Sequence, residues 1–397
     1  MPVLTGLDAW LARPPAALAG ARLGLAANLS ATDGSGRPAA RALLEAGSQV
    51  VRIFAPEHGH DLSFHEGERF GDSRLAGPAI PIVAFYGEGL ALTEESVRGL
   101  DALVFDLPNV GLRCHTYLAN LVETLELSHR LRFPVAILDR PIALGGLELE
   151  GPAAVLSPTT DVAPVPVPFR HAMTWLELAR WIVRHRKLSP IVHEVPMTGW
   201  QRPMWHDATG LPWWPPSPNL PRFESAVAYA ATVLLEGTNV SEGRGTQSPF
   251  ELFGAPWLSP DRLRGALEES GLEGVGFEPA RFVPTRSKHT GTACEGLTLR
   301  VLDRSRFRPL ATGAAILAAL ARLWPDRLEW PSNTRTGIHF IDRLLGTAEL
   351  RQAIGAGRPV REVFARFEES ASRFARERNE CLIYGREEET ASCPAKP

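Results

Sequence analysis

The sequence predicts an α/β fold, in which a parallel sheet covered by helices is followed by a smaller unit of mixed helices and strands. Two observations indicate this arrangement. Short β-branched apolar runs alternate with segments of helical spacing over the first 150 residues, as in chains that build a parallel sheet. The proline-rich segment Ala153–Pro168 then interrupts the alternation. Because 397 residues suffice for two domains, we expect one domain over residues 1–155 and a second over residues 156–397.

The elements of the first domain follow from its apolar patterning. Strands are expected at Arg22–Ala27, Gln49–Ala55, Ile80–Phe85, Ala102–Leu107 and Pro134–Asp139. Helices are expected over about 38–46, after an N-cap at Thr93, and over about 115–131. The last of these has Leu118, Leu121, Val122 and Leu125 at the spacing of one apolar helix face.

The remaining elements are less regular. A loop rich in proline contains four of the ten tryptophans, Trp200, Trp205, Trp213 and Trp214. Helices are expected at Thr174–Arg186, Arg222–Leu234, Ala311–Leu323 and Val360–Arg378, and strands near Ile191–Pro196, Gly276–Val283 and Leu297–Val301.

Composition and charge exclude several classes of protein. The chain has 42 Lys and Arg against 45 Asp and Glu, a net charge of -3, without a long block of one sign, so we expect no nucleic-acid partner. No window reaches the roughly 18 uninterrupted apolar residues of a membrane-spanning helix. The first residues lack the apolar core of a signal peptide and the cysteines lack CxxC spacing, so we expect a cytoplasmic protein.

The common cofactor motifs are also missing. The chain has no GxGxxG, no GxxxxGK[ST] and no GxSxG string, so we expect no nucleotide cofactor and no serine nucleophile. Glu57, His58, His60 and His65 form the densest candidate for a metal site, but neither HExxH nor HxxEH occurs. We therefore expect an enzyme or binding protein without a cofactor, and keep a metal site as an alternative.

Ionisable residues follow three of the expected strands. They are Glu57, His58 and His60 after the second strand, Asp106, Arg113, His115 and Tyr117 at and after the end of the fourth, together with the polar Asn109, and Asp139 and Arg140 at the end of the fifth. The carboxyl ends of parallel strands meet at one edge of a sheet, where ligands bind. The pattern therefore predicts an acid/base site, although Asp106 and Asp139 could simply cap neighbouring segments.

Two loops indicate the ligand. Residues 236–257 combine glycines with Glu236, Glu242 and Arg244, a mixture that lets the backbone approach a polar ligand closely. A guanidinium such as Arg244 or Arg113 suits a ligand carboxylate. The tryptophan-rich loop favours a carbohydrate ligand, because flat indole faces stack on sugar rings, with filling of the interdomain core as the alternative.

Ordered motifs along nearly the whole chain resemble the exo-β-N-acetylmuramidases of the NamZ type. They include APEHG around Pro56, VFDLPNVGLRCHTY from Val104, LDRP from Leu138, RHAMT from Arg170, PSPNLP from Pro216, EGTNVSEGRGT from Glu236 and FVPTRSKHTG from Phe282. The resemblance implies a Rossmann-like N-terminal domain, a smaller α+β C-terminal domain and an active cleft between them. It also implies removal of terminal N-acetylmuramic acid from the non-reducing end of peptidoglycan fragments.

Glycoside hydrolysis uses two carboxyl groups, one protonated and one ionised. The resemblance assigns one carboxyl group to Glu57 and the second to Glu126, which aligns with a family glutamate. Glu150, Glu242 and Glu68 are further candidates for the second group. The residues expected to contact substrate are His58, Arg113, Tyr117, Asp139, Arg140, Glu150, Asn219, Asn239, Glu242 and Arg244.

The chain departs from the family motifs near the expected cleft. Asn109 replaces an aspartate, Cys114 and His115 replace two aromatic residues, and Ala172 replaces a glycine. A catalytically silent muropeptide-binding protein is therefore one alternative. A metal-dependent amidase or deacetylase built on Glu57, His58 and His60 is another.

Overall fold

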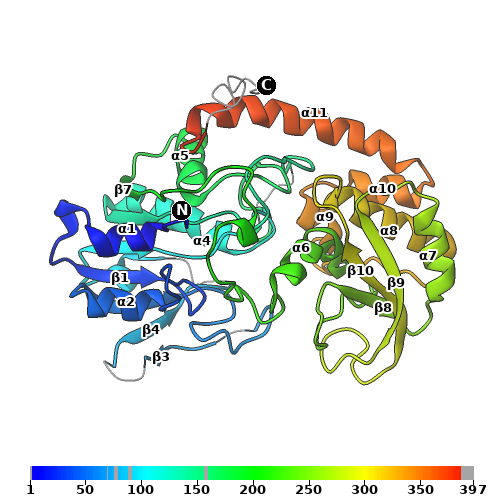
Figure 1. Ribbon diagram of the computed structural model, residues 1–397, viewed down its shortest axis with the longest axis horizontal. Helices are drawn as coiled ribbons and strands as arrows, with labels where there is room; N and C mark the ends of the chain where they lie inside the picture. Colours follow the sequence, from blue (N-terminus) through cyan, green and yellow to red (C-terminus); the bar gives the residue numbers. More distant parts are fainter. Residues whose placement is uncertain (1, 69, 76–78, 88–91, 156–159, 386–397) are drawn as a thin grey trace, which may run out of the picture.

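The computed structural model describes residues 2–68, 70–75, 79–87, 92–155 and 160–385. It contains a seven-stranded sheet with the strand order β3-β4-β2-β1-β5-β6-β7 (Figure 1). The strands are β1 (Arg22–Ala26), β2 (Gln49–Ala55), β3 (Ser73–Arg74), β4 (Pro81–Ala84), β5 (Ala102–Phe105), β6 (Pro134–Leu138) and β7 (Ile191–Val195). Neighbours pair in parallel, except for β3 on β4. The predicted fold class and the five predicted strands of the first domain are confirmed.

Helices cover both faces of this sheet. On one face, α1 (Gly6–Ala12) packs against β6 and β7, and α2 (Ala39–Glu45) packs against β2. On the other face lie α3 (Glu94–Val97), α4 (Tyr117–Leu131) and α5 (Trp175–Arg186). Capping boxes at Thr5, Thr93 and Thr174 fix the starts of α1, α3 and α5 by pairing side chains with free backbone N–H groups.

The first unit extends beyond the boundary predicted at residue 155. Strand β7 pairs with β6 along its whole length, from Ile191 on Pro134 to Val195 on Leu138. Val165 and Val167, in the proline-rich segment, are fully buried in the same core as α4 and α5. The segment is therefore not a linker between domains, and the sheet ends only after β7.

The second unit has its own antiparallel sheet and core. Its strands β8 (Leu252–Ala255), β10 (Cys294–Val301) and β9 (Val275–Phe282) lie in that order. Around them are α6 (Phe223–Thr232), α7 (Pro260–Glu268), α8 (Pro309–Leu323), α9 (Phe340–Leu345), α10 (Glu349–Gly355) and the 3-10 helix η3 (Val233–Gly237). Apolar residues of α6 and α8 dominate the core.

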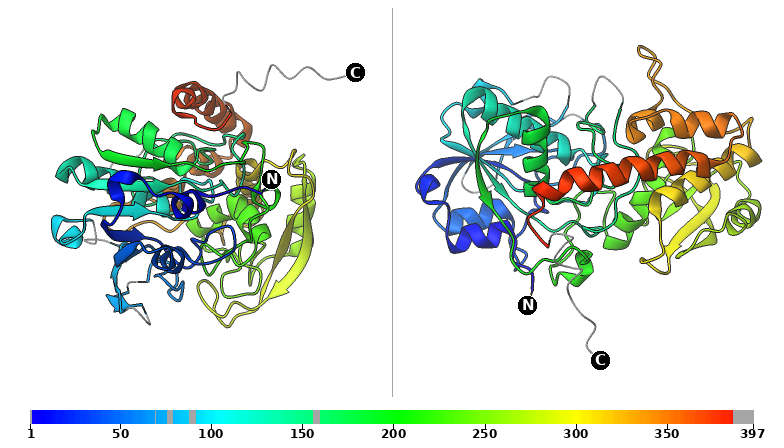
Figure 2. Two further views of the ribbon diagram at one scale, coloured as in Figure 1. Left: turned by 60° about the vertical axis from the view of Figure 1, so that its left-hand side comes forward. Right: turned by 90° about the horizontal axis from the view of Figure 1, so that it is seen from above.

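The long helix α11 (Val360–Arg378) connects the two units at the end of the chain. It starts beside α10 and runs back along the molecule to α5 (Figures 1 and 2). Phe374 packs on Trp181 of α5 with ring centroids 5.4 Å apart. Among the described residues, no helix is long and apolar enough to cross a membrane.

Candidate active site

Glu57 stands directly after β2, in a turn where His58 and Gly59 adopt left-handed backbone conformations with φ of 73° and 78°. Its side chain is buried and held at both oxygens. The Thr116 hydroxyl donates to Oε2 at 2.7 Å, and the Gly67 amide donates to Oε1 at 3.1 Å. Thr116 is the N-cap residue of α4, so the loop after β5 positions the carboxylate that follows β2.

The environment of Glu57 favours its charged form. Burial alone would raise its pKa, but the adjacent His58 and the hydrogen bonds from Thr116, Gly67 and Tyr86 outweigh that effect and hold the pKa below its ordinary value. Burial in turn lowers the pKa of His58. Glu57 is therefore an ionised carboxylate at neutral pH beside a neutral imidazole.

Glu57 faces a cavity of about 370 Å³ that residues of both units line. From the first unit come Glu57, His58, Glu66, Gly67, Tyr86, Cys114, His115, Thr116, Tyr117, Asp161, Val162, Ser217 and Leu220. From the second come Tyr229, Glu236, Glu242, Arg244, Phe250, Ser287, Lys288, Phe340, Arg343 and Leu344. The cavity is thus a cleft between the two units, where the resemblance places it.

Arg244 organises the wall from the second unit. Its guanidinium lies 2.9 Å from Glu66, 2.5 Å from Glu236 and 3.0 Å from Glu242. Lys288 donates to Glu242 at 2.8 Å. This side of the cavity therefore joins three carboxyl groups and two cations in one ion-pair network. Glu66 is the one member of the network that belongs to the first unit.

Two glycines allow the backbone to fold closely around Arg244. Gly243 and Gly245 have φ of 78° and 75°, which favour glycine. A Cβ on Gly243 would lie 2.5 Å from the Leu252 carbonyl oxygen, and one on Gly245 would lie 2.5 Å from the Arg286 amide. The glycine-rich loop therefore packs against β8 and the loop after β9, which sets the place of Arg244.

The network separates the pKa values of its two buried glutamates. Burial raises the pKa of Glu236, and the Glu242 charge raises it further, against the opposing effect of Arg244. Burial also acts to raise the pKa of Glu242, but Lys288 and Arg244 outweigh it and lower that pKa. The cavity therefore holds two carboxyl groups of lowered pKa, Glu57 and Glu242, and one carboxyl group of raised pKa, Glu236. Such a pairing suits acid/base chemistry.

Five of the residues predicted from the sequence line this cavity: Glu57, His58, Tyr117, Glu242 and Arg244. The Tyr117 hydroxyl accepts from Asn28 at 2.7 Å and donates to the Pro216 carbonyl at 2.6 Å. Asn219 lies behind the lining and donates to Glu66 at 3.1 Å. The structure therefore joins strand ends of the first unit to the glycine-rich loop of the second.

Glu126 does not reach the cavity, and the expectation that it points into the cleft is wrong. It forms an ion pair with Arg186 of α5, and its side chain is 43% exposed. The further candidates Glu68 and Glu150 are also elsewhere. Glu68 is exposed, and Glu150 is partly buried in an ion pair with Arg170 at 3.0 Å. Of the three further candidates, Glu242 alone lines the cavity with Glu57.

Arg113 and Asn239 also have structural positions instead of the predicted contact with substrate. Arg113 is fully buried and donates to the carbonyl oxygens of Pro152, Val167 and Leu344 at 2.6–3.0 Å. Leu344 belongs to α9, so Arg113 ties the two units together. The Asn239 side chain binds the backbone at residues 327 and 329, outside the cavity lining.

Asp139 and Arg140 likewise hold the fold at the carboxyl end of β6. Arg140 donates to Asp106 at 2.8 Å and to the Thr32 carbonyl at 2.9 Å. Asp139 is buried and accepts from the Tyr384 hydroxyl at 2.7 Å, and burial raises its pKa to about 7. The segment after α11 covers this strand end, so substrate in the Glu57 cavity does not meet Asp139.

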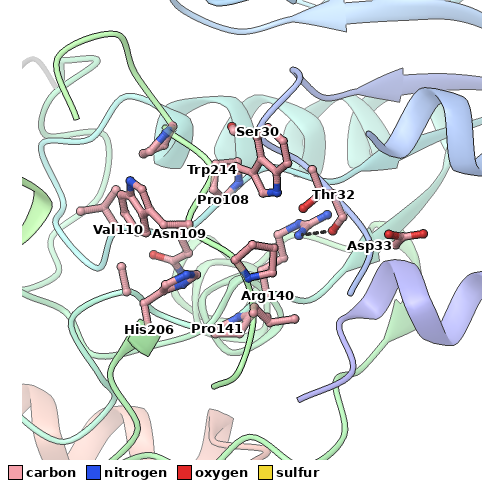
Figure 3. A pocket seen from close by; sticks show the side chains of 15 residues that line it. Ser30, Thr32, Asp33, Pro108, Asn109, Val110, Arg140, Pro141, His206 and Trp214 are labelled. Carbon is pink, nitrogen blue, oxygen red and sulfur yellow. Dashed lines mark hydrogen bonds between the residues drawn. The ribbon is translucent and has the colours of Figure 1, made fainter. Parts of the chain in front are cut away.

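The four tryptophans of the proline-rich loop do not line the Glu57 cavity, so the sugar-binding role predicted for them is not supported. Trp200 is buried, and Trp205 is stacked against the Arg170 and Arg304 guanidinium groups. Trp213 and Trp214 line a separate hollow of about 50 Å³ with Asn109 and Arg140 (Figure 3). This hollow lies beyond the carboxyl ends of β1, β5 and β6, and residues 211–214 of the proline-rich loop form its other side.

Two departures from the family motifs lie outside the cavity. Asn109 is buried, donates to the Met173 carbonyl at 3.1 Å and accepts from the Gly111 amide at 2.9 Å. Ala172 is fully buried with φ of 49°. Both residues therefore shape loops behind the site, whereas Cys114 and His115 line it directly.

Several residues of the site were not predicted from the sequence to bind substrate or to act as an acid or base. Glu236 was noted only as part of a charged loop, and Glu66, Tyr86, Asp161 and Lys288 were not singled out. Tyr86 follows the third predicted strand, and Lys288 lies in a family motif. Both residues could therefore have been identified from the sequence. Within the described ranges, no group of three or more His, Cys, Asp or Glu side chains is placed to hold a metal ion.

Comparisons with known proteins agree with this geometry. A family model described as exo-beta-N-acetylmuramidase NamZ, N-terminal, matches residues 23–224, and its C-terminal counterpart matches residues 227–384. The division between the models falls at the start of α6, not at residue 155.

A curated relative and two solved structures are similar over nearly the whole chain. The chain is 35% identical over 383 residues to the peptidoglycan beta-N-acetylmuramidase NamZ of Bacillus subtilis (strain 168), covering 96% of this chain and 91% of that protein. Crystal structures of two DUF1343 family proteins from Bacteroides fragilis NCTC 9343 superpose with TM-scores of 0.87 and 0.73. Each is 25% identical and covers 97% of this chain and 99% of its own.

Proposed function

The chain belongs to the exo-β-N-acetylmuramidase NamZ family, and on that premise we propose that it is a glycoside hydrolase. Its substrate is a peptidoglycan fragment, from whose non-reducing end it releases terminal N-acetylmuramic acid. The observation that carries the proposal is the cavity between the units, in which the ionised Glu57 lies together with a second carboxyl group of raised pKa, Glu236.

The two carboxyl groups take the two roles that cleavage of a glycosidic bond requires. Glu57 acts in its ionised form, either on the anomeric carbon or on the water that attacks it. Glu236 replaces Glu126 as the second group and supplies the proton to the departing oxygen. Burial and the Glu242 charge raise the pKa of Glu236, while the contact with Arg244 acts to lower it.

The wall around Arg244 also suits the charge of the substrate. Muramic acid carries a lactyl carboxylate, and both Arg244 and Lys288 line the cavity. Arg244 Nη1 is buried and lies within ion-pair distance of Glu66, yet makes no hydrogen bond with a described residue. A ligand carboxylate is one partner that would complete the donors of this guanidinium.

Two results support an active enzyme over a silent binding protein. The carboxylate at the end of β2 is present and ionised, and the replaced residues Asn109 and Ala172 lie outside the cavity lining. Neither substitution therefore removes a group from the neighbourhood of Glu57.

The test is incubation of the purified protein with N-acetylmuramyl-N-acetylglucosamine, with mass spectrometry of the products, with and without EDTA. We expect free N-acetylmuramic acid in both samples from the wild-type protein, and none from Glu57→Gln with unchanged thermal unfolding. Binding without product would favour the silent binding protein, and loss of product in EDTA would favour a metal-dependent enzyme. Turnover by Glu57→Gln at the wild-type rate would contradict the role of Glu57.

We further propose that the protein works in the cytoplasm on fragments recovered from the cell wall. The support is the cysteine pattern alone, since the four cysteines lie far apart in the sequence without CxxC spacing, as is typical of a reducing compartment. Fractionation of cells followed by immunoblotting tests the location; a signal confined to the extracellular fraction would contradict it.

A further inference from the structure

His115 occupies the floor of the cavity beside Glu57, at a position where the family motif has an aromatic residue. Its ring packs edge-on against Tyr117, with centroids 4.4 Å apart and planes at 84°. Tyr117 is itself fixed, because its hydroxyl bonds to both Asn28 and the Pro216 carbonyl. The orientation of the imidazole is therefore held by its neighbour and not by hydrogen bonds of its own.

Neither ring nitrogen of His115 has a hydrogen-bond partner among the described residues. Nδ1 is fully buried without one, and Nε2, which is not fully buried, has none either; the residue as a whole is 8% exposed. The other histidine of the cavity differs, since Nδ1 of His58 lies 3.0 Å from the Phe64 carbonyl oxygen. Polar atoms of buried side chains are nearly always paired in native proteins, so the unpaired Nε2 in this cleft indicates a partner that arrives with the ligand.

The protonation state of His115 limits what that partner can be. Burial lowers its pKa to about 4, against the opposing effect of the Glu57 charge. At neutral pH the ring is neutral and offers one N–H donor and one nitrogen acceptor. A neutral ring beside the Glu57 carboxylate does not attract the lactyl carboxylate of the sugar.

We propose that His115 is a substrate-binding residue that hydrogen-bonds a neutral polar group of the muramic acid ring, either the acetamido group or a hydroxyl. Both groups offer a donor and an acceptor that match a neutral imidazole. The inference rests on the proposed function, because it takes the cavity as the sugar site. It assigns this chain a contact through a ring nitrogen, which the tyrosine of the family motif does not have.

The first test is His115→Phe, which keeps an aromatic ring against Tyr117 and removes both nitrogens. With a chromogenic N-acetylmuramic acid glycoside we expect KM to rise about tenfold or more, with a smaller change in kcat. The melting temperature should stay equal or rise, because no hydrogen bond within the protein is lost. A structural role predicts the opposite, a lower melting temperature with KM unchanged, and that result would overturn the proposal.

His206→Phe is the matched control. His206 also has a buried Nε2 without a partner, but it lies in the separate small hollow shown in Figure 3. We expect its KM to equal that of the wild type. His115→Gln, which restores an amide near the ring nitrogens, should recover part of the affinity. If His206→Phe raises KM as much as His115→Phe does, the effect is not specific to the cavity and the proposal fails.

Inhibition constants separate the two possible contacts. N-acetylmuramic acid and muramic acid, which lacks the acetyl group, are compared as inhibitors of the wild type and of His115→Phe. A preference for the acetylated sugar that disappears in the variant assigns the contact to the acetamido group, and an equal loss for both sugars assigns it to a hydroxyl. No loss for either sugar overturns the inference.

These outcomes stay distinct from failure of the proposed function. If the wild type releases no N-acetylmuramic acid, the enzyme assignment fails, and calorimetric binding of the two sugars to the wild type and His115→Phe still tests the contact.

Discussion

The hydroxyl of Tyr384 donates to Oδ2 of Asp139 at 2.7 Å, although 245 positions separate the two residues in the chain. The same hydroxyl accepts from the Met197 amide at 2.9 Å. Together these bonds fasten the end of the described chain to the carboxyl end of β6. They also explain why a residue expected to meet substrate is instead enclosed.

Removal of this contact should weaken the whole fold. Tyr384→Phe removes the donor to Oδ2 of the buried Asp139, whose Oδ1 still accepts from the Arg140 and Leu176 amides, so we expect a loss of about 1–2 kcal/mol in the free energy of unfolding. Urea unfolding measures it. Tyr229→Phe is the control and should cost less, since among the described residues the Tyr229 hydroxyl has only the Cys114 sulfur as a partner, at 3.6 Å. Equal losses in the two variants would contradict a special role for Tyr384.

Asp139 should also give the stability a dependence on pH. Burial raises its pKa to about 7, above the value of about 3.9 expected in the unfolded chain. Between these values the folded protein binds the additional proton, so the contribution of Asp139 to stability falls as the pH rises from about 4 to 7. We expect Asp139→Asn to remove this decline. Profiles of unfolding free energy against pH that run parallel in both proteins would contradict it.

The activity profile should depend on the coupling between Glu236 and Glu242. The proposed mechanism needs Glu57 ionised and Glu236 protonated, so activity should fall as the pH rises through the pKa of Glu236. The Glu242 charge raises that pKa. Glu242→Gln should therefore move the alkaline limb of the kcat/KM profile to lower pH. A limb that stays in place would argue against Glu236 as the acid.

Ala172 should be a site at which stability can be gained. It has φ of 49°, a conformation that costs an L-residue about 1–2 kcal/mol but costs glycine far less. After the entropy cost of glycine, Ala172→Gly should stabilise the protein by about 0.5–1 kcal/mol in thermal unfolding. Ala179→Gly, inside α5, is the matched control and should destabilise by about 1 kcal/mol. Destabilisation by both variants would show that Ala172 is not strained.

Glu126→Ala should leave catalysis intact. The side chain is 43% exposed and pairs with Arg186 at the surface, so the loss in stability should stay below about 1 kcal/mol. We expect kcat and KM of the wild type with the chromogenic glycoside. A loss of activity comparable to that of Glu57→Gln would restore Glu126 as the second catalytic group.

The strands of the first unit were predictable because they are short, continuous apolar runs, typical of a buried parallel sheet. Strand β3 was not, since its two residues are exposed and carry no apolar pattern. Helix α1 was also missed, although Thr5 and Asp8 form its capping box. The error at residue 155 has a physical cause: prolines usually mark linkers, but here Val165 and Val167 between them are buried against α4 and α5.

The candidate site was predictable where it follows strand ends, as for Glu57 and His58. It was not predictable where long-range packing decides. The partners of Arg113 include the Leu344 carbonyl, 231 positions away, and no local pattern records that contact. Helical spacing placed Glu126 at the edge of the apolar face of α4, but only the position of α5 determined that Arg186 would bind it.

The path of α11 has a consequence for how the protein is made. Domains generally fold as units while the chain is still being synthesised, beginning at the N-terminus. Here the carboxyl end of β6 obtains Tyr384 only after the whole second unit has left the ribosome. The carboxyl end of β6 is therefore completed only after the second unit has been synthesised, and a chain interrupted within the second unit lacks this bond.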